Sequence, residues 1–204
     1  MKLFGEHHLS NFLSQKLENA KREIQFLNEV ELKKTSKEDV LNNLLRQTKV
    51  PKLEVNLSKR TSKVGMRDVP AQRFPKTYDV RPGVSYPCAL VTYIYPIPSN
   101  SQLMLHAPAG YVQKVSADVT LAHNEMRIEY QTLYGNEILS DEVKNKVKDW
   151  IISVHEEIEN TVAEINNQIE KFNNGISLEL SALLDAKFKN FEDRKKQNDD
   201  LNDF

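Results

Sequence analysis

One stretch, residues 86–134, constrains the fold of this chain more than any other part of the sequence. It is the only segment rich in β-branched and aromatic residues, and charged sequence with a helical period lies on both sides of it. Such side chains are enriched in strands because they pack well on a pleated surface. The pattern therefore predicts an antiparallel sheet, against which the flanking helices pack.

The clearest hairpin in this stretch joins residues 115–122 to residues 126–130. Apolar side chains alternate with polar ones in both segments, as in Val119 and Leu121, and a turn at 123–125 separates them. Period-two alternation of this kind is typical of strands with one buried face.

Three further strands are expected from shorter runs. Residues 89–97 are continuously apolar, and the chain must leave the ladder at 96–98 because proline donates no backbone hydrogen bond. A turn at 99–101 then leads to a strand at 103–107. Earlier in the chain, residues 52–57 alternate polar and apolar residues as a short strand would.

Helical spacing dominates the two ends of the chain. Apolar residues recur every three or four positions over residues 9–30, and Ser36 with Asp39 approximates a capping box for a second helix. Ser140 caps a third helix, whose apolar stripe runs to Phe172.

A turn is expected at residues 173–175, where Asn-Asn-Gly offers a left-handed helix cap. A last helix over 178–196 then completes a helical hairpin. These elements predict an α+β fold: an antiparallel sheet of four to six strands, flanked by N-terminal helices and a long C-terminal helical hairpin.

The organisation expected is one structural unit with three regions. Residues 1–50 form the N-terminal helices, residues 51–139 the β-rich core and residues 140–204 the helical hairpin. A chain of 204 residues buries enough surface to stabilise a core without disulfide bonds.

Several features favour a cytoplasmic location without a membrane partner. The single cysteine excludes an internal disulfide, and the first ten residues lack the apolar run of a signal peptide. No apolar stretch approaches the roughly 20 residues that span a bilayer.

Residues 58–83 show neither helical nor strand period, and proline and glycine punctuate them, so a long loop or arm is expected. The segment carries seven cations against Asp68 and Asp79, a local charge of +5 in a chain whose net charge is −1. Cations on flexible backbone neutralise phosphates, and nearby aromatic rings stack on bases. The candidate nucleic-acid-binding residues are Lys59, Arg60, Lys63, Arg67, Arg73, Lys76 and Arg81.

The search for a metal site gives no ligand set. His155-Glu156-Glu157 begins like the HExxH zinc motif, but Glu159 stands where the second histidine would be. The adjacent His7 and His8 do not share a helix face. Neither a metal ion nor a cofactor is therefore expected.

The case for an enzyme is equally weak, and no catalytic residue is predicted. The sequence lacks a glycine-rich phosphate loop, a nucleophile elbow and a CxxC pair. Cys88 would need a histidine base beside it, and His106 and His123 both lie in the sheet region. A small buried side chain in a strand is the alternative interpretation of Cys88.

One resemblance adds to this interpretation. The run VTYIYPIPSNSQLMLHAPAGY, the following hairpin VSADVTLAHNEMRIEY, the long helix from Ser140 and the basic FEDRKK ending resemble the N-terminal region of large, mostly uncharacterised bacterial proteins. Many of those proteins carry a restriction-endonuclease-like domain further along the chain, of a kind common in antiviral defence. The match covers residues 85–197 and includes Tyr93, Pro96, Pro108 and Tyr111, while residues 99–101 lack the Gly-Asp of that family's turn.

The resemblance implies a front module that assembles, regulates or senses for a nuclease, and no catalytic activity carries over. We therefore expect a non-enzymatic protein-interaction, assembly or regulatory module. The expected partner is another protein, or a second copy bound coiled-coil fashion through the C-terminal helices; nucleic acid bound through residues 58–83 is the alternative. The candidate protein-interface residues are Val154, Ile158, Ile165, Ile169, Phe188 and Phe191.

Overall fold

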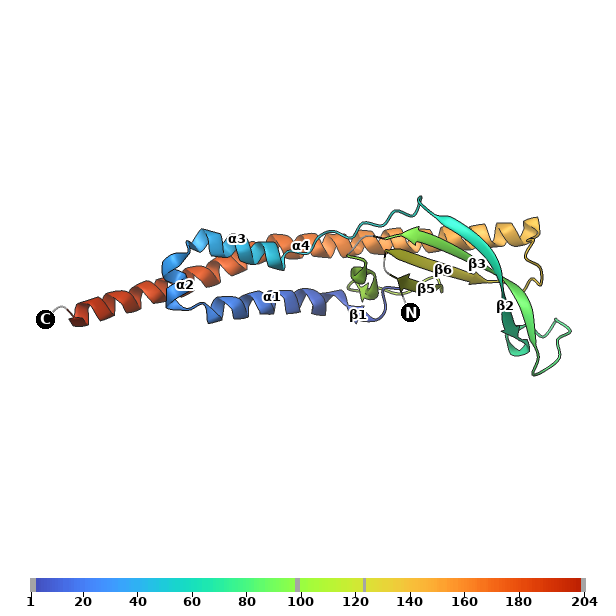
Figure 1. Cartoon of the computed structure of the whole chain (residues 1–204), viewed down its shortest axis with the longest axis horizontal. Helices are drawn as coiled ribbons and strands as arrows, with labels where there is room; N and C mark the ends of the chain where they lie inside the picture. Colours follow the sequence, from blue (N-terminus) through green and yellow to red (C-terminus); the bar gives the residue numbers. More distant parts are fainter. Residues whose placement is uncertain (1–2, 98–99, 123, 203–204) are drawn as a thin grey trace. The chain divides into compact units, whose positions relative to one another are not determined.

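The computed structural model describes residues 3–97, 100–122 and 124–202, and it confirms the α+β class (Figure 1). A four-stranded antiparallel sheet has the order β2-β3-β6-β5, with β2 at Thr61–Pro70, β3 at Ser85–Pro96, β5 at Asp118–Ala122 and β6 at Glu125–Gln131. A separate two-stranded pair joins β1 (His7–His8) to β4 (His106–Ala107).

The predicted hairpin is confirmed as β5 and β6, although its first strand begins at Asp118 rather than at residue 115. Val119 lies opposite Ile128, and Leu121 lies opposite Met126, so the alternating apolar residues share one face. Asn124 turns the chain with a φ of +66°, a left-handed conformation that asparagine adopts more readily than most residues. The predicted turn residue His123 lies outside the described residues.

The expectation of irregular backbone throughout residues 58–83 is wrong, because β2 pairs with β3 along its whole length, from Thr61 opposite Ile94 to Pro70 opposite Ser85. Only Val64 and Met66 mark the strand as an alternation, and Val69, the one buried residue of β2, breaks it because it lies three positions after Met66. This change of parity hides the strand from a search for period two.

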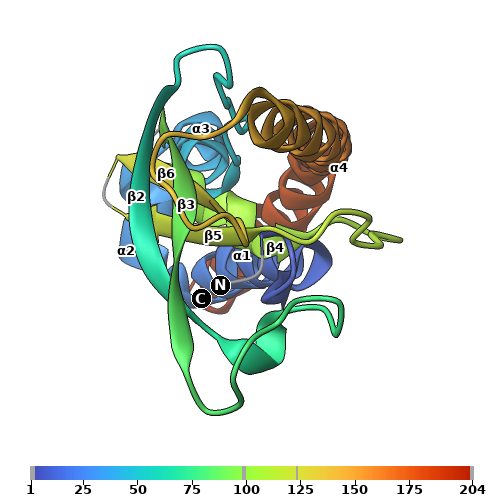
Figure 2. The same ribbon diagram turned by 90° about the vertical axis from the view of Figure 1, so that its right-hand side faces the viewer.

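One face of the sheet is covered by the first part of α4 (Asp141–Asn202), as Figure 2 shows. The ring of Tyr130 on β6 packs 4.8 Å from Trp150 on the helix, between ring centroids. Tyr95 on β3 is fully buried, and its hydroxyl lies 2.7 Å from Nε2 of His155. The opposite face is solvent-facing along β2 but covered further in: Lys63, Thr92 and Glu129 form one cross-strand row, in which Lys63 is exposed and Thr92 is buried.

Of two further predicted strands, the one at 52–57 is absent from the described structure and the one at 103–107 keeps only its last two residues. Residues 52–57 form no strand in the described structure. Their alternation reflects the burial of Leu53 and Leu57, and the Asn56 side chain accepts hydrogen bonds from the backbone of the next turn. At 103–107 the chain forms the 3-10 helix η2 (Ser101–Leu105) before the short β4. The apolar run there is buried but not extended, which periodicity alone does not distinguish.

The chain divides into two compact units. The first contains residues 3–7 and Leu53–Glu164, and the second contains His8–Lys52 and residues 165–202. The second unit is helical: α1 (Leu9–Phe26), α2 (Glu29–Lys34) and α3 (Lys37–Thr48) accompany the second part of α4. The core of this unit contains Ala20, Ile24, Leu44, Leu180 and Leu184.

The N-terminal helices differ from the prediction at one boundary. The helix expected over residues 9–30 ends at Phe26, and the Asn28 side chain accepts a hydrogen bond from the Val30 amide at the start of α2. The predicted cap of α3 is confirmed, because the Ser36 hydroxyl accepts from the Asp39 amide at 3.1 Å.

The predicted turn of a C-terminal hairpin is wrong, since α4 continues as one helix to Asn202. Its apolar stripe crosses Gly175 without a break, because Ile176 and Leu180 are buried. Asn173 does not cap a helix end: its amide group donates to the Val50 carbonyl at 2.8 Å and accepts from the Val50 amide at 3.0 Å. A motif typical of helix ends therefore serves tertiary contacts inside the helix.

Candidate interaction site at the sheet edge

Strand β2 forms one edge of the sheet, with β3 on one side and no described strand on the other. In an antiparallel pair, alternate residues direct their amide and carbonyl groups away from the partner strand. A long edge strand therefore presents a row of unpaired backbone donors and acceptors, which is a template for a further strand. We call this row the free edge of β2.

A groove lies beside the free edge, on the face of the sheet that α4 covers. It encloses about 340 Å³. The buried side chains of Val91, Tyr93 and Val147 belong to its lining, whereas Val64 on β2 and Ile138 are 42% and 81% exposed. We call it the β2–α4 groove, and an extended segment added to β2 would place alternate side chains in it.

The polar lining of the β2–α4 groove is mainly basic. Lys144 and Lys148 of α4 lie opposite a single acid, Glu137. Lys144 is held by Asp141 at 3.1 Å, while Lys148 is exposed and has no ion-pair partner among the described residues. The groove thus favours an apolar segment that also carries negative charge.

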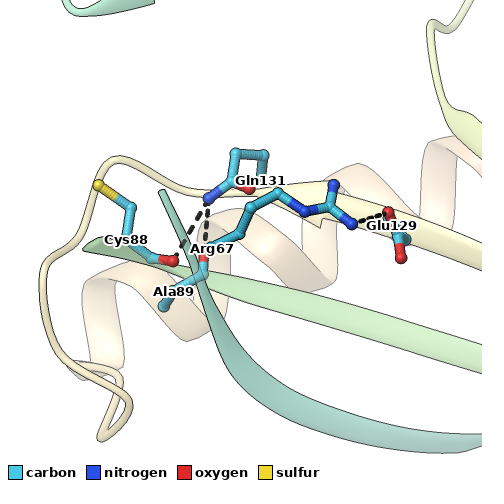
Figure 3. Close-up of polar contacts among 5 residues, drawn as sticks. All are labelled: Arg67, Cys88, Ala89, Glu129 and Gln131. Carbon is cyan, nitrogen blue, oxygen red and sulfur yellow. Dashed lines mark hydrogen bonds and ion pairs between the residues drawn. The ribbon is translucent and has the colours of Figure 1, made fainter. Parts of the chain in front are cut away.

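The other side of β2 is also basic. Lys63 and Arg67 project from the solvent-facing face of the sheet, and Arg67 forms an ion pair of 2.7 Å with Glu129 on β6 (Figure 3). Lys63 has no ion-pair partner in the described part of the chain. Both faces that flank the free edge therefore present cations, and Asp68 is the one acid on β2 itself.

A hydrogen-bond network fixes β3 behind this edge. The Gln131 side-chain amide donates to the Ala89 carbonyl at 3.2 Å and to the Thr132 carbonyl at 3.1 Å. It also donates a longer hydrogen bond to the Cys88 carbonyl, and Figure 3 shows its contacts with Cys88 and Ala89. The Thr132 hydroxyl also donates to the Ala89 carbonyl, at 2.7 Å. These bonds continue the β3–β6 pairing past its last register pair and keep β3 in place.

Gln131 holds one buried polar atom, Oε1, that has no hydrogen-bond partner among the described residues. Cys88 is buried beside it, and burial raises the pKa of the thiol. A raised pKa disfavours the thiolate that nucleophilic chemistry needs. Of the two histidines considered as a base for Cys88, His106 contacts other residues: its ring centroid lies 5.4 Å from that of His7, and its Nδ1 lies 3.0 Å from the Gln102 carbonyl. The second, His123, lies outside the described residues.

The seven candidate cations of residues 58–83 occupy three settings. Lys59 and Arg60 precede β2, where the Arg60 guanidinium donates to the Leu57 carbonyl at 3.4 Å. Lys63 and Arg67 lie on β2. The remaining three, Arg73, Lys76 and Arg81, lie on a loop over residues 71–84 that the Ala71 amide closes on the Val84 carbonyl at 2.8 Å.

Of the six residues predicted as a protein interface, five are buried within the chain and one is partly buried. Ile158, Ile165 and Ile169 are almost completely buried within the chain, and Phe188 is partly buried against the helical core. Val154 and Phe191 are buried as well. Five of the six side chains are therefore already covered within the chain, and Phe188 keeps part of its surface exposed.

The His155-Glu156-Glu157 run likewise serves the fold. Tyr95 and His155 form the hydrogen bond described above, and burial followed by the nearby Arg60 charge lowers the pKa of the imidazole. The Glu157 carboxylate accepts from the Tyr111 hydroxyl at 2.8 Å and from the amide of Val115 at 2.5 Å. Burial and this carboxylate together raise the pKa of Tyr111.

The groove residues Val64, Ile138, Lys144 and Lys148 were not anticipated from sequence. The one sequence signal for the groove was an isoleucine, Ile138, between a turn and a helix cap; its side chain is exposed.

No helix among the described residues is both long enough and apolar enough to cross a membrane. Comparison of the chain with family models, curated proteins and solved structures returned no significant match.

Proposed function

We propose that this protein is a non-enzymatic interaction module that binds a partner protein by strand addition. An extended segment of the partner pairs with the free edge of β2 and places alternate side chains in the β2–α4 groove. The observation that carries this proposal is the coincidence of an unpaired strand with an adjacent groove of about 340 Å³. Peptide recognition at a sheet edge combines backbone bonds for affinity with side-chain pockets for specificity.

The charges define the partner segment. Lys63 flanks the free edge on one face, beside the Arg67–Glu129 ion pair, and Lys148 lies in the groove on the other. An incoming strand with acidic residues on its solvent side and β-branched apolar residues on its groove side complements both. The resemblance to nuclease-linked bacterial proteins would place this segment in a DNA-targeting assembly.

The same charges argue against a second copy as the occupant. An antiparallel pairing of β2 with β2 of another chain, centred on Gly65, would place Lys63 opposite Arg67 of the second copy. Like charges directly opposite each other destabilise a strand pair. The partner is therefore a different chain.

A synthetic peptide tests this proposal. The probe is an acetylated, fluorescein-labelled peptide of about eight residues in which valine and glutamate alternate, a length close to that of natural strands. Fluorescence anisotropy should show saturable binding. A peptide with lysine in place of glutamate, and one with a central proline, should not bind.

Ile138→Asp should weaken binding at least about tenfold, because it places a charge in the apolar groove. Its matched control is Ile152→Asp, since Ile152 is an apolar side chain on α4 that is also more than half exposed but lies outside the groove lining. Equal binding by the two variants, or equal binding of the acidic and basic peptides, would refute the proposal.

A further inference from the structure

A second surface stands apart from the β2–α4 groove, on the loop over residues 71–84. Arg73, Lys76 and Arg81 are exposed there, and none has an ion-pair partner within the described residues. Asp79 is the single acid of the loop. Arg67, by contrast, is neutralised by Glu129. The loop thus concentrates cations whose charge the protein leaves available.

The loop is ordered by an aromatic cluster. The Phe74 ring lies 5.6 Å from Tyr78 and 5.6 Å from Tyr86, between centroids, in edge-to-face arrangements. The Tyr86 hydroxyl accepts from the Arg81 amide at 2.8 Å. Gly83 adopts a φ of +81°, which glycine takes at no steric cost. Ordered backbone lowers the conformational entropy lost when a ligand binds.

Tyr78 gives this basic loop an aromatic surface. Its side chain is 48% exposed, and its contact with Phe74 has an interplanar angle of 61°. At this angle the Phe74 ring does not stack flat on Tyr78.

This combination selects one class of ligand. Free phosphate would use the cations but not the ring, and an acidic peptide gains little from an exposed aromatic face. A single-stranded nucleic acid uses both, because its phosphates repeat along the chain and its unpaired bases stack on aromatic side chains. A duplex keeps its bases inside the helix and offers no base face to Tyr78.

We propose that the 71–84 loop binds single-stranded nucleic acid, with phosphates at Arg73, Lys76 and Arg81 and a base stacked on Tyr78. The surface is independent of strand addition, because it shares no residue with the groove. Each site is therefore tested by variants that leave the other intact.

The experiment measures anisotropy of fluorescein-labelled oligothymidylate of about 15 nucleotides over a series of salt concentrations, using the full chain. Three phosphate contacts predict a slope of log K against log salt of about −2, at roughly −0.7 per phosphate for single strands. The triple variant Arg73→Ala, Lys76→Ala and Arg81→Ala should abolish this slope and weaken binding at least about tenfold.

The charge-matched control replaces three exposed lysines of α4, Lys171, Lys189 and Lys195, with alanine. It should bind oligothymidylate as the unmodified protein does. An equal loss in the control and the loop variant would show that net charge alone drives binding, and would overturn the assignment.

Tyr78 separates stacking from charge. Tyr78→Ala should weaken binding about 5- to 100-fold, whereas Tyr78→Phe should keep it, because phenylalanine retains the ring face. A Tyr78→Ala variant that binds normally, or a duplex that binds more tightly than the single strand, would refute the proposal. The triple loop variant should still bind the valine–glutamate peptide, so failure at one site is distinguishable from failure at the other.

Discussion

His155 makes the stability of the sheet-containing unit depend on pH. Burial and the Arg60 charge lower the pKa of its imidazole in the folded protein, while the Glu159 charge opposes them. The unfolded chain therefore binds more protons near and below the ordinary histidine value of about 6.5, so acid favours unfolding. The stability that the neutral imidazole contributes is fully present above about pH 6.5. It is lost as the pH falls from there through the lowered pKa of His155 in the folded protein.

Denaturation by urea at pH 5, 6, 7 and 8 measures this effect. His155→Gln, which keeps a hydrogen-bonding partner for the Tyr95 hydroxyl without a titratable ring, should flatten the decline in unfolding free energy below about pH 6.5. An unchanged pH dependence in His155→Gln would show that other groups cause the decline. The remaining histidines are common to both proteins, so the difference between them isolates His155.

Asn173 supports the helical unit through two hydrogen bonds to the backbone of Val50, which is buried. Asn173→Ala leaves that amide and carbonyl without partners and should cost about 1–3 kcal/mol of unfolding free energy. The neighbouring Asn174 is exposed, so Asn174→Ala is the matched control and should cost less than about 0.5 kcal/mol. Equal effects of the two substitutions would contradict the structural role of Asn173.

Among the elements, α4 offers a test at Gly175, which lies inside the helix and has open space where a Cβ would stand. Gly175→Ala should therefore stabilise the protein by about 0.5–1 kcal/mol, because alanine has the higher helix propensity. A left-handed cap at this position would give the opposite sign. Thermal or urea denaturation distinguishes a continuous helix from the hairpin expected from sequence.

The same element shows what could be predicted from sequence. The apolar spacing before Phe172 correctly predicted a long helix, and Ser140 marked its start, where its hydroxyl accepts from the Val143 amide. Asn-Asn-Gly looked like a stop because such residues are common at helix ends. The decisive fact is tertiary, since Asn173 bonds Val50, and local sequence does not report a partner so distant in the chain.

The strands also show that contacts between distant parts of the chain can decide a local conformation. The β5–β6 hairpin was predictable because both strands alternate and a short turn joins them. Strand β2 was not, because it is largely exposed, and its pairing with β3 decides its conformation. The candidate site shares this difficulty: Lys63 and Arg67 were candidates from the sequence, whereas the free edge and the groove with its lysines are defined only once the strand order is known.

For the whole molecule, the charge on β2 predicts the state of the free protein. Lys63 and Arg67 oppose edge-to-edge pairing of two copies, and five of the six apolar residues predicted as a helical interface are buried. Size-exclusion chromatography with light scattering should give the monomer mass of 23.5 kDa at both low and moderate salt. A dimer that persists at both salt concentrations would contradict this expectation and would restore self-association as the primary role.

The two compact units predict a local response to ligands. Strand addition and nucleic-acid binding both involve residues of the unit that contains the sheet. Hydrogen exchange in α1 and α3 should therefore stay unchanged when either probe is bound. Protection that spreads into those helices would show that binding stabilises both units together.

The most direct test of strand addition is hydrogen exchange of the β2 amides, measured residue by residue by NMR with and without the valine–glutamate peptide. In the free protein, amides directed toward β3 should exchange slowly, and alternate amides on the free edge should exchange fast. The account predicts that saturating peptide slows the second set along Thr61–Pro70. Unchanged exchange on the free edge of β2, with the peptide fully bound, would contradict it.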